Sequence, residues 1–198
     1  MDLEEYRTSF IVGTLVLALV AASPALSVVL PLRGGSERFS EIWLLGLGHM
    51  VGDYPFNVTV GHTYSVFVGV GNHMGCSEYY VVYVKFRNRT QPLPDADGYI
   101  PSSLPPLYEF RFFVADGEIW ESPLVFAFLN VSLQHDSMFV GNISINGVAF
   151  SVNCSSTWDS ENNVFYYQLF FELWMYDYAS SSLRYHDHIV GLWLNMTV

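Results

Sequence analysis

Residues 66–70 (Val-Phe-Val-Gly-Val) and 80–84 (Tyr-Val-Val-Tyr-Val) decide the fold class, because both consist almost entirely of β-branched and aromatic residues. Such residues fit the half-buried surface of a β-sheet. Farther along, Asn146-Gly147 lies between the apolar segments 143–145 and 148–150, which predicts a hairpin with a type I′ turn. Many short strands separated by turn residues predict a sandwich of two antiparallel sheets.

The predicted β-sandwich domain occupies residues 39–198. No amphipathic helix of useful length is expected within it, and apolar residues alternate with polar ones along much of its length. The expected strands are Phe39–Gly46, Phe56–Val60, Thr63–Gly71, Tyr79–Arg87, Tyr108–Val114, Leu124–Leu133, Asn142–Asn153, Val164–Tyr176 and His186–Val198. A Pro-rich loop, residues 91–106, interrupts them, and loops of this length often serve as binding surfaces or covers.

The N-terminal segment differs from this pattern. Residues 8–32 (TSFIVGTLVLALVAASPALSVVLPL) carry no charge between Arg7 and Arg33. A helix of about 25 residues reaches ~37 Å, enough to cross a hydrocarbon core of about 30 Å. We therefore predict a cytoplasmic head (1–7), a transmembrane helix (8–32) and a linker (33–38). A cleaved signal peptide is the alternative, but the head is net negative and lacks the usual basic n-region, and the apolar run is long.

Small residues recur on one side of this predicted helix: Gly13, Thr14, Ala18, Ala21 and Ala22. Because helices in lipid associate through close packing of small residues, this stripe predicts contact with another membrane-protein subunit as well as with the lipid bilayer. The alternative is an ordinary membrane anchor, in which the alanines have no role in helix packing.

The charge balance excludes one class of partner. Eight Lys and Arg stand against 19 Asp and Glu, a formal net charge of −11. Such a chain repels nucleic acid, so we expect no nucleic-acid binding.

Six of the ten asparagines lie in N-x-S/T sequons: Asn57, Asn88, Asn130, Asn142, Asn153 and Asn195. This density predicts N-linked glycans and places the domain outside the cell. Alternatively, Ser and Thr simply alternate along exposed strands. The two cysteines, Cys76 and Cys154, agree with an oxidising compartment and suggest a disulfide, although two unrelated thiols remain the other interpretation.

Candidate chemistry is sparse. His186 and His188 lie two residues apart, on one face of an expected strand, and form a weak metal-site candidate that lacks a third ligand. The sequence shows no catalytic signature, so we expect neither an enzyme nor a cofactor. Residues 165–176 are aromatic at both odd and even positions, which suggests a strand covered on both faces.

From residue 39 onward the chain resembles the archaeal membrane-protein family catalogued as DUF1616. The matching stretches are 39–46, 54–61, 68–73, 79–80, 116–123 and 192–195, and they include Tyr54, Pro55, Asn72, His73 and Trp120. The resemblance implies an extracellular, immunoglobulin-like β-sandwich that follows membrane helices and has no established activity. The chain departs from the family in having one such helix, and in having Met74 where the family motif Asn-His-Glu has its carboxylate.

These features predict a single-pass, N-glycosylated membrane protein that acts as a non-catalytic accessory or scaffold subunit of an archaeal cell-envelope or membrane complex. A glycan-binding module that assists surface glycosylation is the alternative, and an exposed concave aromatic strip would favour it. A metal-dependent envelope enzyme is the third hypothesis.

Overall fold

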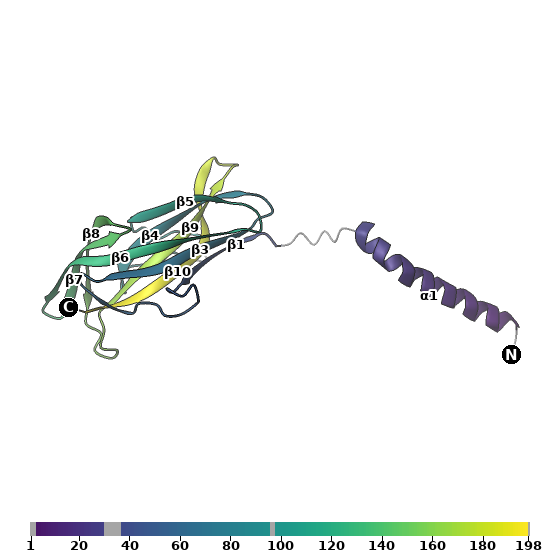
Figure 1. Ribbon diagram of the computed structural model, residues 1–198, viewed down its shortest axis with the longest axis horizontal. Coiled ribbons are helices and arrows are strands. Elements are labelled where there is room, and N and C mark those ends of the chain that lie inside the picture. Colours follow the sequence, from purple (N-terminus) through teal and green to yellow (C-terminus); the bar gives the residue numbers. More distant parts are fainter. Residues whose placement is uncertain (1–2, 30–36, 96–97, 198) are drawn as a thin grey trace. The chain divides into compact units, whose positions relative to one another are not determined.

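The computed structural model describes residues 3–29, 37–95 and 98–197, and the chain divides into two units, Met1–Arg38 and Phe39–Val198. The first unit contains one helix, α1 (Leu3–Val29), which ends within the predicted span (Figure 1). Residues 30–32 of that span and most of the predicted linker lie outside the described residues. Among the residues described, no helix has the length and apolar character that crossing a membrane requires.

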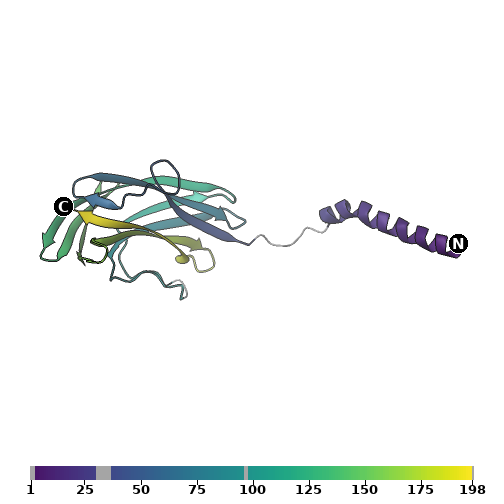
Figure 2. The same ribbon diagram turned by 90° about the horizontal axis from the view of Figure 1, so that it is seen from below.

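The second unit is a stack of two five-stranded sheets, which confirms the prediction of a mainly β fold. One sheet has the strand order β1-β3-β6-β7-β8 and the other β2-β10-β9-β4-β5 (Figure 1). Figure 2 shows the sheets as two layers. The strands are β1 (Phe39–Leu45), β2 (Asn57–Thr59), β3 (Thr63–His73), β4 (Glu78–Asn88), β5 (Tyr108–Val114), β6 (Ile119–Gln134), β7 (Ser137–Ile145), β8 (Val148–Thr157), β9 (Tyr166–Asp177) and β10 (Ser182–Thr197).

Two details of the predicted sandwich are wrong. The strand pairs are not all antiparallel, because the short strand β2 runs parallel to β10, with Asn57 beside Asn195. The range Asn142–Asn153, expected as one strand, contains two, and the hairpin predicted at Asn146-Gly147 is confirmed between β7 and β8. At its turn Asn146 has φ 49° and Gly147 has φ 81°, the two positive angles that a type I′ turn requires.

The core lies between the sheets and follows the alternation of the strands. In β4, for example, Tyr80, Val82, Val84 and Phe86 point inward and are buried. The Phe86 ring stacks on Tyr167 of β9, with ring centroids 5.3 Å apart. Burying one side chain of this size contributes roughly 1.5–3 kcal/mol, so the alternating pattern fixes which face of each strand points inward.

The outer face of β4 and β9 is covered by the Pro-rich loop. Lys85 and Glu172 form an ion pair of 2.8 Å on this face, and both side chains are almost fully buried. Ser102 of the loop joins them, because its carbonyl accepts a hydrogen bond from Lys85 and its N–H donates to Glu172. The loop is therefore a cover, held by the only lysine in the chain.

Candidate functional site

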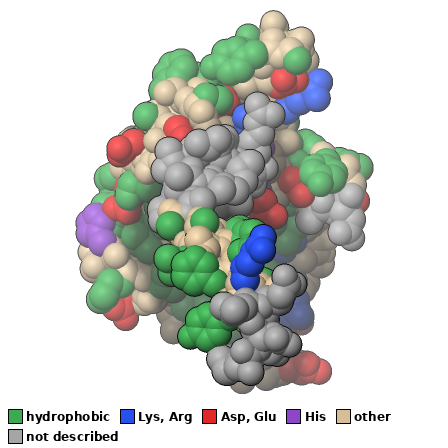
Figure 3. Space-filling model, turned by 90° about the vertical axis from the view of Figure 1, so that its right-hand side faces the viewer, with side chains coloured by type: hydrophobic (Ala, Val, Ile, Leu, Met, Phe, Trp, Pro, Cys, Tyr) green, Lys and Arg blue, Asp and Glu red, His purple; other side chains and the backbone are tan. Residues whose placement is uncertain are grey.

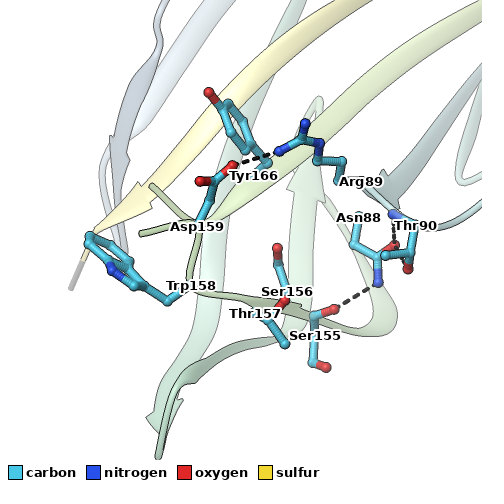
Figure 4. A pocket seen from close by; sticks show the side chains of 9 residues that line it. All are labelled: Asn88, Arg89, Thr90, Ser155, Ser156, Thr157, Trp158, Asp159 and Tyr166. Atoms are coloured by element: carbon cyan, nitrogen blue, oxygen red, sulfur yellow. Dashed lines mark hydrogen bonds and ion pairs between the residues drawn. The ribbon is translucent and has the colours of Figure 1, made fainter. Parts of the chain in front are cut away.

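An open pocket of about 440 Å³ lies where β4 ends, beside the C-terminal end of β8 and the start of β9. Figure 4 shows its side chains: Asn88, Arg89, Thr90, Ser155, Ser156, Thr157, Trp158, Asp159 and Tyr166. A second depression of about 380 Å³ is lined by Phe56, Arg89, Tyr166 and Trp193. Arg89 and Tyr166 belong to both, so the two depressions are adjacent. We call them together the Arg89 groove.

The turn that carries Arg89 is fixed by Asn88. The side-chain oxygen of Asn88 accepts hydrogen bonds from the Thr90 N–H, the Thr90 hydroxyl and the Gln91 N–H. Its amide nitrogen donates to the carbonyl of Ser155 on β8, 2.8 Å away. Asparagine favours turns because its side chain bonds to the backbone that follows it. The turn is thus attached to the opposite sheet, and Arg89 extends over the groove.

Asp159 faces Arg89 across the pocket at 2.6 Å (Figure 4). The carboxylate also accepts hydrogen bonds from the backbone N–H groups of Glu161 and Asn162 and from the Asn162 side chain. These bonds, above all the one from the Asn162 side chain, hold the pKa of Asp159 below its usual value, and Arg89 lowers it further. Asp159 is therefore ionised at neutral pH and orients the Arg89 guanidinium.

Aromatic rings form the rest of the groove. The Arg89 guanidinium lies over the Tyr166 ring at 5.4 Å, and Arg87 lies over Trp193 at 5.2 Å. Tyr166 and Trp193 meet edge to face, with centroids 5.8 Å apart. Trp158 and Trp193 are 43% and 38% exposed, so large parts of both rings remain open to solvent. Cations above rings gain about 0.5–2 kcal/mol, which holds these side chains in place.

The six sequon asparagines do not share one environment. Asn57, Asn130 and Asn153 are exposed, and Asn88 and Asn142 are half-buried. Asn195 is 8% exposed, and its amide accepts a hydrogen bond from the Phe165 N–H and donates one to Asn57. Both polar groups of the Asn195 side-chain amide therefore hold the fold together, and the glycan on this residue stays a prediction.

The predicted disulfide between Cys76 and Cys154 is wrong. Cys76 precedes β4, where its thiol donates to Glu78, whereas Cys154 is buried in the core and contacts Gln91, which follows β4. The 11 residues of β4 span about 35 Å, far beyond the ~7 Å between Cα atoms that a disulfide tolerates. Burial raises the pKa of the Cys154 thiol to about 11, so it is protonated and unreactive.

His186 and His188 lie at a bulge of β10, with ring centroids 5.3 Å apart. His186 is bonded to the Ser40 hydroxyl at 3.0 Å, and Ser40 is bonded in turn to the Tyr80 hydroxyl. Burial, with His188 as a second cause, lowers the pKa of His186. No group of three potential metal ligands occurs in the part of the chain that the structure describes, and this histidine connects β10 to β1.

Four of the five residues of the family motif make contacts that hold the fold together. Asn72 is fully buried, and its amide bonds to the backbone of Met74, Cys76 and Val114 as well as to Tyr80. Tyr54, which precedes Pro55, donates to the Leu44 carbonyl, His73 stacks on Phe39, and Trp120 stacks on Phe112 at 3.7 Å. In α1, Gly13, Thr14, Ala18 and Ala21 are exposed, and the helix includes Ala22.

Sequence reasoning missed the Arg89 groove. Asn88-Arg89-Thr90 was interpreted only as a sequon, and its turn chemistry was the signal for a structured arginine. Trp158, Asp159 and Trp193 come from separate segments, so only the pairing of β9 with β10 and the position of β8 bring them together.

Comparison with solved structures finds distant likeness to β-glucosidases. A β-glucosidase from Listeria innocua in complex with glucose is 8% identical, with a TM-score of 0.41. A substituted form of that enzyme in complex with laminaribiose is also 8% identical, with a TM-score of 0.43. Each match covers 82% of this chain and 16% of the enzyme, so the chain spans about a sixth of those proteins. No curated protein matches the chain.

A family model agrees with the sequence resemblance. It matches residues 34–136, just over half of the 198 residues, and covers the linker, β1 to β6 and the stretch containing Trp120. The chain therefore belongs to the family described as Domain of unknown function (DUF1616).

Proposed function

We propose that the β-sandwich is a non-catalytic saccharide-binding domain and that the Arg89 groove is its binding site. The observation that carries this proposal is the combination of partly exposed aromatic rings with hydrogen-bonding groups in one depression. A pyranose ring presents apolar C–H faces and a rim of hydroxyls. Trp158, Tyr166 and Trp193 suit the faces, while Arg89 and the hydroxyls of residues 155–157 suit the rim. The groove also has the size of a small-molecule site.

The same groups argue against glycoside hydrolysis. That reaction needs two carboxyl groups about 5–9.5 Å apart, one of which is protonated. Among the described residues that line the groove, Asp159 is the only carboxylate, and its lowered pKa keeps it ionised. Its bonds to Arg89, Glu161 and Asn162 hold it as a support for the arginine.

The preferred ligand is an uncharged saccharide. Arg89 is already paired with Asp159, so this pair contributes no net positive charge to the groove. The chain as a whole carries −11, which repels acidic glycans over the Debye length of about 8–10 Å. Figure 3 shows acidic side chains (red) scattered among hydrophobic ones (green) on one face of the molecule.

The test is to measure, by tryptophan fluorescence and calorimetry, the binding of a panel of neutral and uronate-containing oligosaccharides to the purified full chain. Arg89→Ala removes a charged hydrogen-bond donor worth about 1.5–3 kcal/mol, so we expect affinity to fall about 10- to 150-fold. Arg111→Ala is the matched control, because Arg111 pairs with Glu109 on β5 and does not line the groove. No binding by any neutral saccharide, or equal losses in the two variants, would overturn the proposal.

A second function, the accessory subunit, is favoured by α1. Its described apolar side chains are exposed around the whole circumference, from Tyr6 to Val20. The Thr14 hydroxyl donates to the Phe10 carbonyl, which turns its methyl group outward. Phe10, Ile11, Thr14, Leu15 and Ala18 line a shallow apolar depression of about 390 Å³. This surface fits an apolar helix of a membrane-protein partner in a cell-envelope complex. In this proposal the sandwich is an immunoglobulin-like domain that lies outside the cell.

Detergent pull-down with mass spectrometry tests this second function. Ala18→Leu fills the depression, so the co-purified membrane subunit should be lost. Leu17→Ala changes an exposed side chain that does not line it and serves as the control. A full chain that purifies alone in mild detergent would refute the idea.

A further inference from the structure

The outer face of β6, β7 and β8 is unusual because it has almost no charge. β7 and β8 contain no Asp, Glu, Lys or Arg, and β6 contains only Glu121. The exposed side chains on these strands are uncharged: polar ones such as Asn130, Asn153 and Ser155 stand beside apolar ones. The exposed large apolar side chains are Ile119, Val125, Leu129, Leu133 and Val148. Natural sheets protect exposed edges such as β8 with charges, and this one carries none.

Three sequons lie together on this face. Asn130 of β6 is directly opposite Asn142 of β7, and Asn142 is opposite Ser151 of β8, two residues before Asn153. Asn130 and Asn153 are exposed and Asn142 is half-buried. Asn153 has φ 44°, so the backbone departs from strand geometry at this residue of the edge strand.

Of the other three sequons, Asn88 and Asn195 use their amide nitrogens to hold segments together, and Asn57 accepts the bond from Asn195 with its amide oxygen. Asn195 bonds to Phe165 and Asn57, and Asn88 bonds to Ser155, Thr90 and Gln91. A sugar replaces one hydrogen of the amide nitrogen. At the buried Asn195 it would have to displace the bond to Asn57, whereas on the β6–β8 face the sugar would extend into solvent.

We infer that N-linked glycans are confined to the outer face of β6, β7 and β8, on Asn153 and on one of the pair Asn130 and Asn142. Directly opposite residues have Cβ atoms about 4.5–5.5 Å apart, so two sugars attached at both positions of the pair would collide. The glycans supply the hydration that charged side chains supply elsewhere, and the glycan on Asn153 blocks the open edge of β8. This inference does not depend on the Arg89 groove.

The sequence makes the test direct. No Lys or Arg lies between Arg111 and Arg184, so trypsin releases residues 112–184 as one peptide that carries all three candidate sites. Asn195 lies in the separate peptide 185–198. In the full chain isolated from the cells that produce it, mass spectrometry should find two glycans on the first peptide and none on the second. A bare peptide 112–184, or a glycan on Asn195, would overturn the inference.

Substitutions then separate the sites. Ser155→Ala destroys the Asn153 sequon without changing the asparagine, and peptide 112–184 should lose one glycan. Asn130→Gln should leave the number of glycans unchanged, because Asn142 takes over, whereas Asn130→Gln combined with Asn142→Gln should remove one. Asn195→Gln is the matched control and should lose none. Three glycans on a single wild-type molecule would show that Asn130 and Asn142 can carry glycans at the same time. That result would refute the inference that only one of the two is modified.

Discussion

The buried ion pair beneath the Pro-rich loop allows a quantitative test of the fold. Lys85→Met removes the positive charge and leaves the Glu172 carboxylate, whose side chain is 0% exposed, without its counter-ion. Breaking a buried pair by removing one partner costs about 3–5 kcal/mol, because the remaining charge is desolvated and uncompensated. Typical domains are stable by only about 5–15 kcal/mol, so the loss is a large share of the total.

A second substitution should restore much of this loss. Glu172→Gln in the Lys85→Met background removes the unpaired charge, while the Gln oxygen still accepts the hydrogen bond from the Ser102 N–H. We expect the double variant to regain at least half of the stability lost by Lys85→Met alone. Such coupling is what a double-mutant cycle measures for two groups in contact.

The assay is urea denaturation of the full chain, in which tryptophan fluorescence reports unfolding. Arg111→Met is the control, because the Arg111–Glu109 pair is 45% and 42% exposed and exposed pairs contribute only about 0–1 kcal/mol. The reasoning is refuted if Lys85→Met costs less than about 1 kcal/mol, or if the double variant is no more stable than the single one.

Three further predictions concern other parts of the sandwich. Because the pKa of His186 is lowered in the fold, the unfolded chain protonates this imidazole at higher pH than the folded chain does. Stability should therefore be full above pH ~6.5 and fall as the pH drops below it. His186→Asn should flatten this pH dependence in chemical denaturation at pH 5–8. Dithiothreitol should leave the thermal midpoint unchanged in calorimetry, since Cys76 and Cys154 are in separate places and no disulfide joins them; a fall of several degrees would contradict this. Gly69→Ala places a Cβ 2.2 Å from the Trp43 ring, so the Trp43 side chain must shift, and denaturation should show a loss of about 1–3 kcal/mol. Gly117→Ala, where nothing lies within 4 Å but φ is 77°, tests backbone strain separately.

Much of the fold was predictable from local sequence. The alternation in β3 and β4 and the Asn146-Gly147 turn depend on neighbouring residues, and the structure agrees with them. The parallel pairing of β2 with β10 was not predictable, because it joins residues 138 positions apart through Asn57 and Asn195. The disulfide prediction failed for the same reason: composition suggests a compartment, but only the path of β4 shows how far apart the thiols lie.

The Arg89 groove lies where it does because the cover over β4 and β9 is short. The outward residues of β9 are Tyr166, Gln168, Phe170, Glu172, Trp174 and Tyr176, and the three from Gln168 to Glu172 are buried. The Pro-rich loop covers Glu172 through Ser102, and Arg87 closes over Gln168 with a hydrogen bond of 2.7 Å. Beyond Arg87 nothing from the described loop bonds to the sheet face at Tyr166, so this ring and Trp193 remain partly exposed beside Arg89 and Arg87. The loop thus covers the middle of β9 and leaves the groove at the end of the strand that it does not reach.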